Sequence, residues 1–256
     1  MGDTVADPDI PKLLQPAAGV CVRQEIDNIA WLELDGEILV VDALEQPSCE
    51  REVLEAIAET TGDKRVRWVV NTHTHYDHIA LNSVFQERFG AEIVNLETVD
   101  IPAEGLWLGD GEHRVQVVPM TGCHTATDCV VHAPWANTLL VGDIFGWGLV
   151  PWDLPLDTEK LEHIFATYAR LIDYGAETVV PGHGPLCSTK ELERWVSYVK
   201  ELVVAAVLIR DEGVPRAEAR DRFVPPPDMA DWWRFVQWKH EDTVMKITQS
   251  VYRGKL

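Results

Sequence analysis

The chain has 256 residues, of which 46% are hydrophobic, so it is long enough for one large domain or two small ones with a buried core. Its 42 acidic residues outnumber its 22 basic ones, and the net charge of −20 argues against nucleic-acid binding, because phosphate contacts need clustered lysine and arginine. No stretch of about eighteen apolar residues is present, and Met1–Asp7 is acidic where a signal peptide needs basic residues. We therefore expect a cytoplasmic protein that does not associate with membranes.

The first part of the chain mixes predicted strands and helices. Residues 1–16 carry three prolines and are predicted to be an irregular lead-in. Asp35-Gly36 is typical of a hairpin turn between two strands. Ser48 is predicted to cap a helix that ends at Gly62. Alternating or continuous apolar runs predict strands at 20–26, 29–34, 37–42, 66–71, 91–95, 114–119, 129–133, 138–141 and 177–180. Helical patterns occupy 79–89, 158–174, 188–212, 215–222 and 228–253.

The segment 73–78 reads His-Thr-His-Tyr-Asp-His and lies between a predicted strand and a predicted helix. Loops in this position of α/β proteins collect functional groups. The alternating His73 and His75 can direct two imidazoles at one ion from a short extended segment. Asp77 and His78 lie at the start of the following turn and can face a second ion. Neutral imidazole together with carboxylate is a ligand set that suits zinc or iron.

Three shorter motifs follow, each after a strand-like run. They are Gly122-Cys123-His124-Thr125, Gly142-Asp143 and Pro181-Gly182-His183-Gly184. A single histidine is usually structural, but five of the nine histidines fall in such contexts, which favours a metal site. The other four carry no motif, and we expect structural or surface roles for His113, His132, His163 and His240.

The order and spacing of these motifs resemble the metallo-β-lactamase superfamily, in its glyoxalase II-like branch, over residues 20 to 190. The resemblance implies an α/β fold, an αββα sandwich formed as a single domain over 1–256, with a C-terminal helical extension over 188–256. It also implies two metal sites that share one carboxylate. The first would be held by His73, His75 and His124. The second would be held by Asp77, His78 and His183, with Asp143 as the bridge.

The resemblance further implies a dinuclear zinc hydrolase that cleaves an ester, thioester or lactam- or lactone-type bond by metal-bound hydroxide. Asp77 would be the catalytic residue that orients the hydroxide and accepts a proton. Iron and manganese are the alternative metals. A mononuclear iron persulfide dioxygenase with His73, His124 and Asp143 as ligands is a second hypothesis. A non-catalytic protein that retains its metal site is a third.

Two residues differ from what related families usually have, and one loop is predicted to contact the substrate. Cys123 stands where the family usually has glycine, so the loop is expected to be remodelled, with Cys123 either packed in the core or close to the metal. Asp143 argues against a true β-lactamase, in which cysteine or serine is usual. Trp147 and Trp152 follow Asp143 and are predicted to contact an apolar or aromatic small-molecule substrate. The three tryptophans of the last helix, Trp232, Trp233 and Trp238, are expected in the core. A homo-oligomer is left open.

Overall fold

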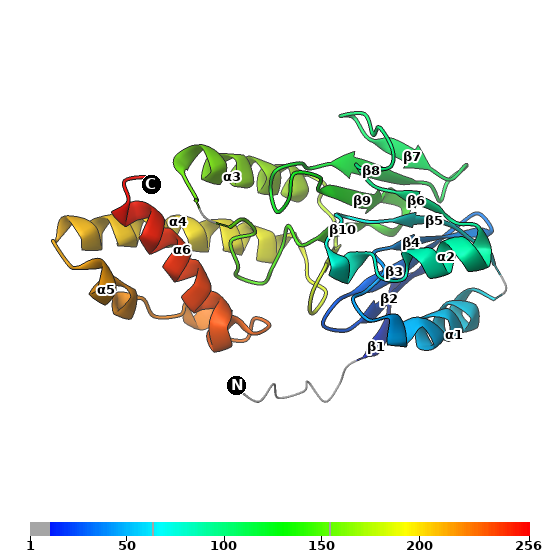
Figure 1. Ribbon diagram of the computed structural model, residues 1–256, viewed down its shortest axis with the longest axis horizontal. Coiled ribbons are helices and arrows are strands. Elements are labelled where there is room, and N and C mark those ends of the chain that lie inside the picture. The colour runs from blue at the N-terminus through cyan, green and yellow to red at the C-terminus, as the bar shows by residue number, and fades with distance from the viewer. Residues whose placement is uncertain (1–10, 63, 154) are drawn as a thin grey trace.

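Two β-sheets pack face to face, and helices cover the outer face of each (Figure 1). The computed structural model describes residues 11–62, 64–153 and 155–256. Val22 of the first sheet and Val117 of the second belong to one apolar cluster between the sheets. The αββα sandwich that the resemblance implied is therefore confirmed.

The first sheet has the order β1-β2-β3-β4-β5-β6. Its strands are β1 (Lys12–Ala17), β2 (Val20–Gln24), β3 (Ile29–Leu34), β4 (Glu37–Val41), β5 (Val66–Val70) and β6 (Glu92–Val94). The predicted hairpin turn joins β3 to β4, with positive φ at both Asp35 and Gly36. Because β4 and β5 are parallel, their carboxyl ends meet at one edge of the sheet. That edge carries Asp42 after β4 and the histidine segment after β5.

The second sheet has the order β11-β10-β9-β8-β7. Its strands are β7 (Leu106–Leu108), β8 (Val115–Pro119), β9 (Cys129–Ala133), β10 (Thr138–Gly142) and β11 (Thr178–Pro181). The parallel pair β10 and β11 places Asp143 and His183 at adjacent strand ends. The β8–β9 connection carries His124. Parallel pairing in each sheet thus gathers the predicted ligands at one edge of the sandwich.

Helices bury one face each against the two sheets. On the first sheet, Val53 of α1 and Phe85 of α2 pack against β3 and β5. On the second, Ile164 of α3 and Trp195 of α4 form a core with β8 to β10. Figure 1 shows α4, α5 and α6 gathered at one end of the molecule. The helices are α1 (Glu50–Thr61), α2 (Asn82–Phe89), α3 (Thr158–Asp173), α4 (Thr189–Asp211), α5 (Arg216–Ala219) and α6 (His240–Tyr252). Short 3-10 turns occupy Pro47–Cys49, Tyr76–His78, Pro134–Ala136, Arg220–Arg222 and Pro227–Met229.

Residues 12–16 are not irregular, as the sequence predicted, but belong to the edge strand β1. β1 pairs with β2 alone, and its register shifts between Leu14 and Ala17, so Pro16 is tolerated there. The strand sequence Lys-Leu-Leu-Gln-Pro-Ala has no apolar pattern that predicts a strand, and none of its residues is fully buried. The rest of the lead-in and the N-terminal segment, residues 1–10, lie outside the described residues. β7 was not predicted.

Two helix boundaries also differ from the prediction. Ser48 does not cap α1; a 3-10 turn through Pro47 precedes the helix, which begins at Glu50. The segment predicted as one helix over 228–253 is irregular up to Arg234, which has a φ of 55°. A π-helical turn at Phe235–Lys239 then leads into α6. Within the described ranges, no helix has the length and apolar character needed to cross a membrane.

Candidate metal centre

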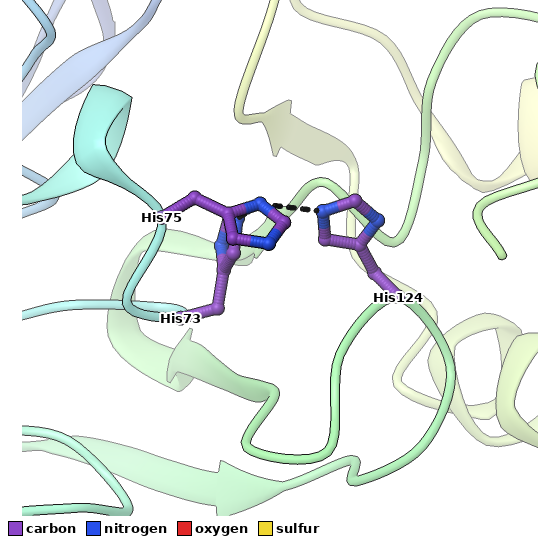
Figure 2. Close-up of side chains that lie close together, drawn as sticks. All are labelled: His73, His75 and His124. Carbon is purple, nitrogen blue, oxygen red and sulfur yellow. Dashed lines mark hydrogen bonds between the residues drawn. The ribbon is translucent and has the colours of Figure 1, made fainter. Parts of the chain in front are cut away.

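Three imidazole nitrogens meet at the edge where β5 ends (Figure 2). His75 Nδ1 lies 3.0 Å from His73 Nε2 and 3.2 Å from His124 Nε2. Nitrogen ligands of a tetrahedral zinc ion are about 3.3 Å apart, given Zn–N bonds of about 2.0–2.1 Å. The spacing in the chain therefore matches three ligands of one ion. His73 is buried, whereas His75 is exposed and leaves one side of this group open.

A second group lies beside the first and contains Asp77, His78, Asp143 and His183. His183 Nε2 is 3.3 Å from Asp77 Oδ2 and 3.2 Å from Asp143 Oδ2. The same Oδ2 lies 3.6 Å from His124 Nε2 of the first group. The carboxylate of Asp143 therefore stands between the two groups. The structure thus brings together all seven residues that the sequence singled out as ligands.

Three buried atoms of the second group have no hydrogen-bond partner in the described part of the chain: Nδ1 and Nε2 of His78, and Oδ1 of Asp143. Two of them, His78 Nε2 and Asp143 Oδ1, lie 3.4 Å apart. Buried polar atoms are rarely left unpaired, because the loss of water costs free energy. A cation bound by these last two atoms would satisfy both of them. The donor set and these two atoms therefore fit a metal centre.

The far side of three of the imidazoles faces an oxygen, as in known metal sites. His124 Nδ1 donates to Pro151 O at 2.7 Å, and His183 Nδ1 donates to Ile26 O at 2.9 Å. His78 Nδ1 lies 3.0 Å from Asp42 Oδ2. Each contact directs the Nε2 atom of its histidine toward the ligand groups. Sequence motifs gave no sign of Asp42, which is distant along the chain.

Burial and neighbouring charge shift the pKa values of His73, His78, Asp143 and His183 strongly. Burial lowers the pKa of His73 to about 2, with His78 acting in the same direction, so the imidazole is neutral. Burial also works against protonation of His78 and His183, but Asp143 and their other carboxylate neighbours outweigh it and raise the two pKa values to about 10 and about 12. Burial works against ionisation of Asp143, yet His78 and His183 hold its pKa well below the usual range. The carboxylates of the second group therefore create a negative potential there, which favours the binding of cations.

The loop that carries His124 is organised by Asp128, a residue without an assigned role in the sequence analysis. Its buried carboxylate accepts from the backbone N–H groups of Cys123, His124 and Thr125 at 2.7–3.0 Å, and from Thr125 Oγ1 at 2.6 Å. The sequence contains a Thr-x-x-Asp spacing from Thr125 to Asp128, which is typical of a local turn and could have indicated this role.

Cys123 is fully buried in the core beneath this loop and belongs to neither ligand group. Burial raises the pKa of its thiol far above the usual range, so a thiolate ligand is disfavoured. The positive φ falls on Gly122 instead, so the expected remodelling at Cys123 is unnecessary. Of the two alternatives, core packing describes Cys123.

A cavity of about 760 Å³ opens onto the ligand groups. His75, His124, Asp143 and His183 line its floor, and Trp152 lines its wall. Trp147 does not line it. A φ of 54° turns that residue into the core, where Nε1 donates to Pro185 O at 3.1 Å. The expectation that Trp147 contacts the substrate is therefore not supported by its position.

The C-terminal segment contributes cavity residues that the sequence analysis missed. Trp233 and Trp238, both expected in the core, line the cavity together with Leu149 and Val150, and Trp233 also packs against the core as expected. Trp232 does pack against the core, beside Phe145. The break in the helix before residue 235 explains the error, because it removes the regular periodicity that the prediction assumed.

Comparison with known proteins identifies related sequences and folds. The family model described as the metallo-beta-lactamase superfamily matches residues 23–98. A hydroxyacylglutathione hydrolase from Mesorhizobium japonicum is 31% identical over 61% of this chain and 62% of its own length. The chain spans less than two thirds of the length of the first curated relatives that it matches.

Two solved structures share the fold. A metallo-beta-lactamase from Pontibacter korlensis superposes with a TM-score of 0.59 and 20% identity, covering 73% of this chain and 97% of that one. A sec-alkylsulfatase from Pseudomonas sp. has a TM-score of 0.71 and 13% identity, covering 94% of this chain and 50% of the other. At these identities the likeness concerns the fold alone.

Proposed function

Because the chain belongs to the metallo-β-lactamase superfamily, in its glyoxalase II-like branch, we propose that it is a dinuclear zinc hydrolase. Its substrate would be a small molecule with an ester, thioester or lactam- or lactone-type bond. The observation that carries the proposal is the position of Asp143 between two donor groups at the floor of an open cavity. One shared carboxylate and six further ligands support two ions rather than one.

Bound zinc would lower the pKa of water and supply positive charge for a developing oxyanion, which is the chemistry that acyl hydrolysis requires. The chain's own residues hold and orient the reacting groups. Asp77 is the proposed catalytic residue as well as a ligand. Burial opposes its ionisation, but His183 and His78 keep the pKa of Asp77 below the usual value. Its carboxylate is thus available to orient water and to accept a proton during leaving-group release.

The apolar wall of the cavity supports a substrate with an apolar or aromatic part. Trp152, Leu149 and Val150 lie on one loop, and Trp233 and Trp238 face the same cavity from the C-terminal segment. Aromatic side chains provide large apolar contact surfaces for such groups.

The two other hypotheses make different demands on the site. A mononuclear iron dioxygenase needs only two histidines and one carboxylate as ligands. Such a site would not use Asp77, His78 and His183 as ligands. A non-catalytic metal protein needs no open cavity beside the ligands. Iron or manganese in place of zinc would alter the metal but not the ligand set.

The test is hydrolysis by the purified protein of a panel containing aryl esters, a hydroxyacylglutathione thioester, a lactone and a β-lactam. We expect turnover of at least one class, its loss on chelation, and its loss in Asp143→Asn. His113→Gln is the matched control, since that exposed histidine lies outside both ligand groups. Turnover that persists in Asp143→Asn, or no turnover by metal-loaded protein, would overturn the proposal.

A further inference from the structure

A second cavity, of about 410 Å³, lies in the C-terminal helical region, where α5 and the 3-10 turn at Arg220–Arg222 pack against α6. Its lining residues come from 217–223 and 240–244, and none of them lines the cavity at the metal centre. Its volume falls in the range of about 300–1,000 Å³ that is usual for small-ligand sites. His240, for which the sequence predicted only a structural or surface role, is one of the lining residues.

The imidazole of His240 has one nitrogen engaged and the other unpaired. His240 is 7% exposed, and its Nδ1 lies 2.8 Å from the hydroxyl of Tyr198, which is buried in the core. Its Nε2 is buried and makes no hydrogen bond of normal geometry with a described residue. Burial lowers the pKa of His240, with the nearby backbone of Phe223 acting in the opposite direction, so the ring is neutral.

The position of the ring proton follows from the hydrogen bond to Tyr198. If the hydroxyl donates to Nδ1, the proton of the neutral ring lies on Nε2, and only that N–H is left unpaired. If Nδ1 donates instead, both the hydroxyl proton and the Nε2 lone pair lack a partner. The first arrangement costs less, because each buried unpaired group costs about 1–3 kcal/mol. The cavity is therefore lined by a buried imidazole whose N–H still needs an acceptor.

Three charged side chains of both signs line the same cavity. Arg220, Asp221 and Glu241 are exposed, and none of these side chains forms a hydrogen bond or an ion pair with the described residues. Arg220 is unpaired although two carboxylates share its cavity. The cavity therefore offers one cation and two anions to a ligand.

An apolar wall completes the cavity. Phe223 is half-buried and Val244 is 3% exposed, and both line it. Small-ligand sites typically combine apolar walls with a few polar groups that fix the orientation of the ligand. A simple anion would be repelled by the two carboxylates, and a simple cation by the guanidinium. The mixed charge beside an apolar wall therefore favours a zwitterion with an apolar body.

We propose that this cavity is a second binding site, for a free amino acid with an apolar side chain. The carboxylate of the ligand would accept hydrogen bonds from Arg220 and from His240 Nε2. Its ammonium would face Asp221 and Glu241, and its side chain would contact Phe223. The inference is independent of the proposed function, because the cavity shares no lining residue with the one at the metal centre.

Isothermal titration calorimetry of the full chain compares three probes. They are L-leucine, L-leucinamide, which lacks the carboxylate, and N-acetyl-L-leucine, which lacks the ammonium. L-leucine should bind most tightly. Arg220→Gln should weaken the binding of L-leucine by about three-fold to ten-fold, less than a buried charge pair gives because Arg220 is exposed, and should hardly affect L-leucinamide. Glu241→Gln should weaken L-leucine by a similar factor and spare N-acetyl-L-leucine.

Arg222→Gln is the matched control, since this exposed arginine belongs to the same 3-10 turn but does not line the cavity. Binding of L-leucine that is unchanged in both Arg220→Gln and Glu241→Gln would assign it to another place, such as the metal centre, and would overturn the inference. Equal binding of the three probes, or no binding of L-leucine at millimolar concentration, would overturn it as well.

A second measurement locates the ligand at His240. In NMR spectra of protein with isotope-labelled histidine, L-leucine should shift the Nε2 resonance of His240, which is identified by its absence from His240→Gln. The resonances of the histidines at the metal centre should not move. Shifts confined to the metal-centre histidines would contradict the inference, even if L-leucine binds.

Discussion

Removing the carboxylate of Asp128 should loosen the loop that holds His124. In Asp128→Ala, the backbone N–H groups of Cys123, His124 and Thr125 all lose their acceptor. Each unsatisfied buried donor costs about 1–3 kcal/mol, and such costs add incompletely. We therefore expect a loss of about 3–5 kcal/mol in the free energy of unfolding.

Asp128→Asn should be milder, because the amide keeps one oxygen. If that oxygen occupies the place of Oδ2, it still accepts from Cys123 and His124. Thr125 Oγ1 can rotate to accept from the new NH₂ group. The loss then comes mainly from the missing charge, and we expect about 1–2 kcal/mol.

Urea unfolding followed by circular dichroism measures both variants, with bound metal determined in parallel. Asp173→Ala is the control, since this exposed aspartate at the end of α3 makes no hydrogen bond or ion pair with the described residues. Because Asp128 holds the loop that carries His124, we also expect metal held by His124 to dissociate more readily in Asp128→Ala. Equal stability of Asp128→Ala and Asp173→Ala would refute the reasoning.

Two further predictions follow from the same geometry. Asp42→Asn should weaken metal binding about 10–100-fold in chelator competition, because it disturbs the oxygen that faces His78 Nδ1; unchanged affinity would show that Asp42 does not orient His78. Trp147→Ala should destabilise the fold by about 3–5 kcal/mol, as expected for a buried aromatic residue, whereas Trp152→Ala should mainly raise KM; the opposite pattern in thermal unfolding and kinetics would contradict their assigned positions.

The grouping of the candidate ligands could be predicted from sequence because the chemistry is concentrated in short motifs at strand ends. His73, His75, Asp77 and His78 share six residues, and the other motifs follow recognisable strands. Parallel pairing then requires neighbouring strand ends to meet at one edge. The hairpin at Asp35-Gly36 was predictable for a similar reason, since the turn needs residues that tolerate positive φ.

The rest depended on contacts that local patterns do not contain. Asp42 reaches His78 only because β4 lies beside β5. The break before Phe235 has no local signal, since no glycine or proline lies between residues 228 and 239. β1 lacks an apolar pattern and forms as an edge strand through pairing with β2. Tertiary pairing, rather than propensity, decides each of these features.

The central claim is tested most directly by the metal content of the purified protein, measured by plasma mass spectrometry without added chelator. The account predicts about two zinc ions per chain, falling to about one when His183→Ala removes a ligand of the second group alone. One iron ion per chain that is unaffected by His183→Ala would contradict the dinuclear centre. It would favour the dioxygenase hypothesis instead.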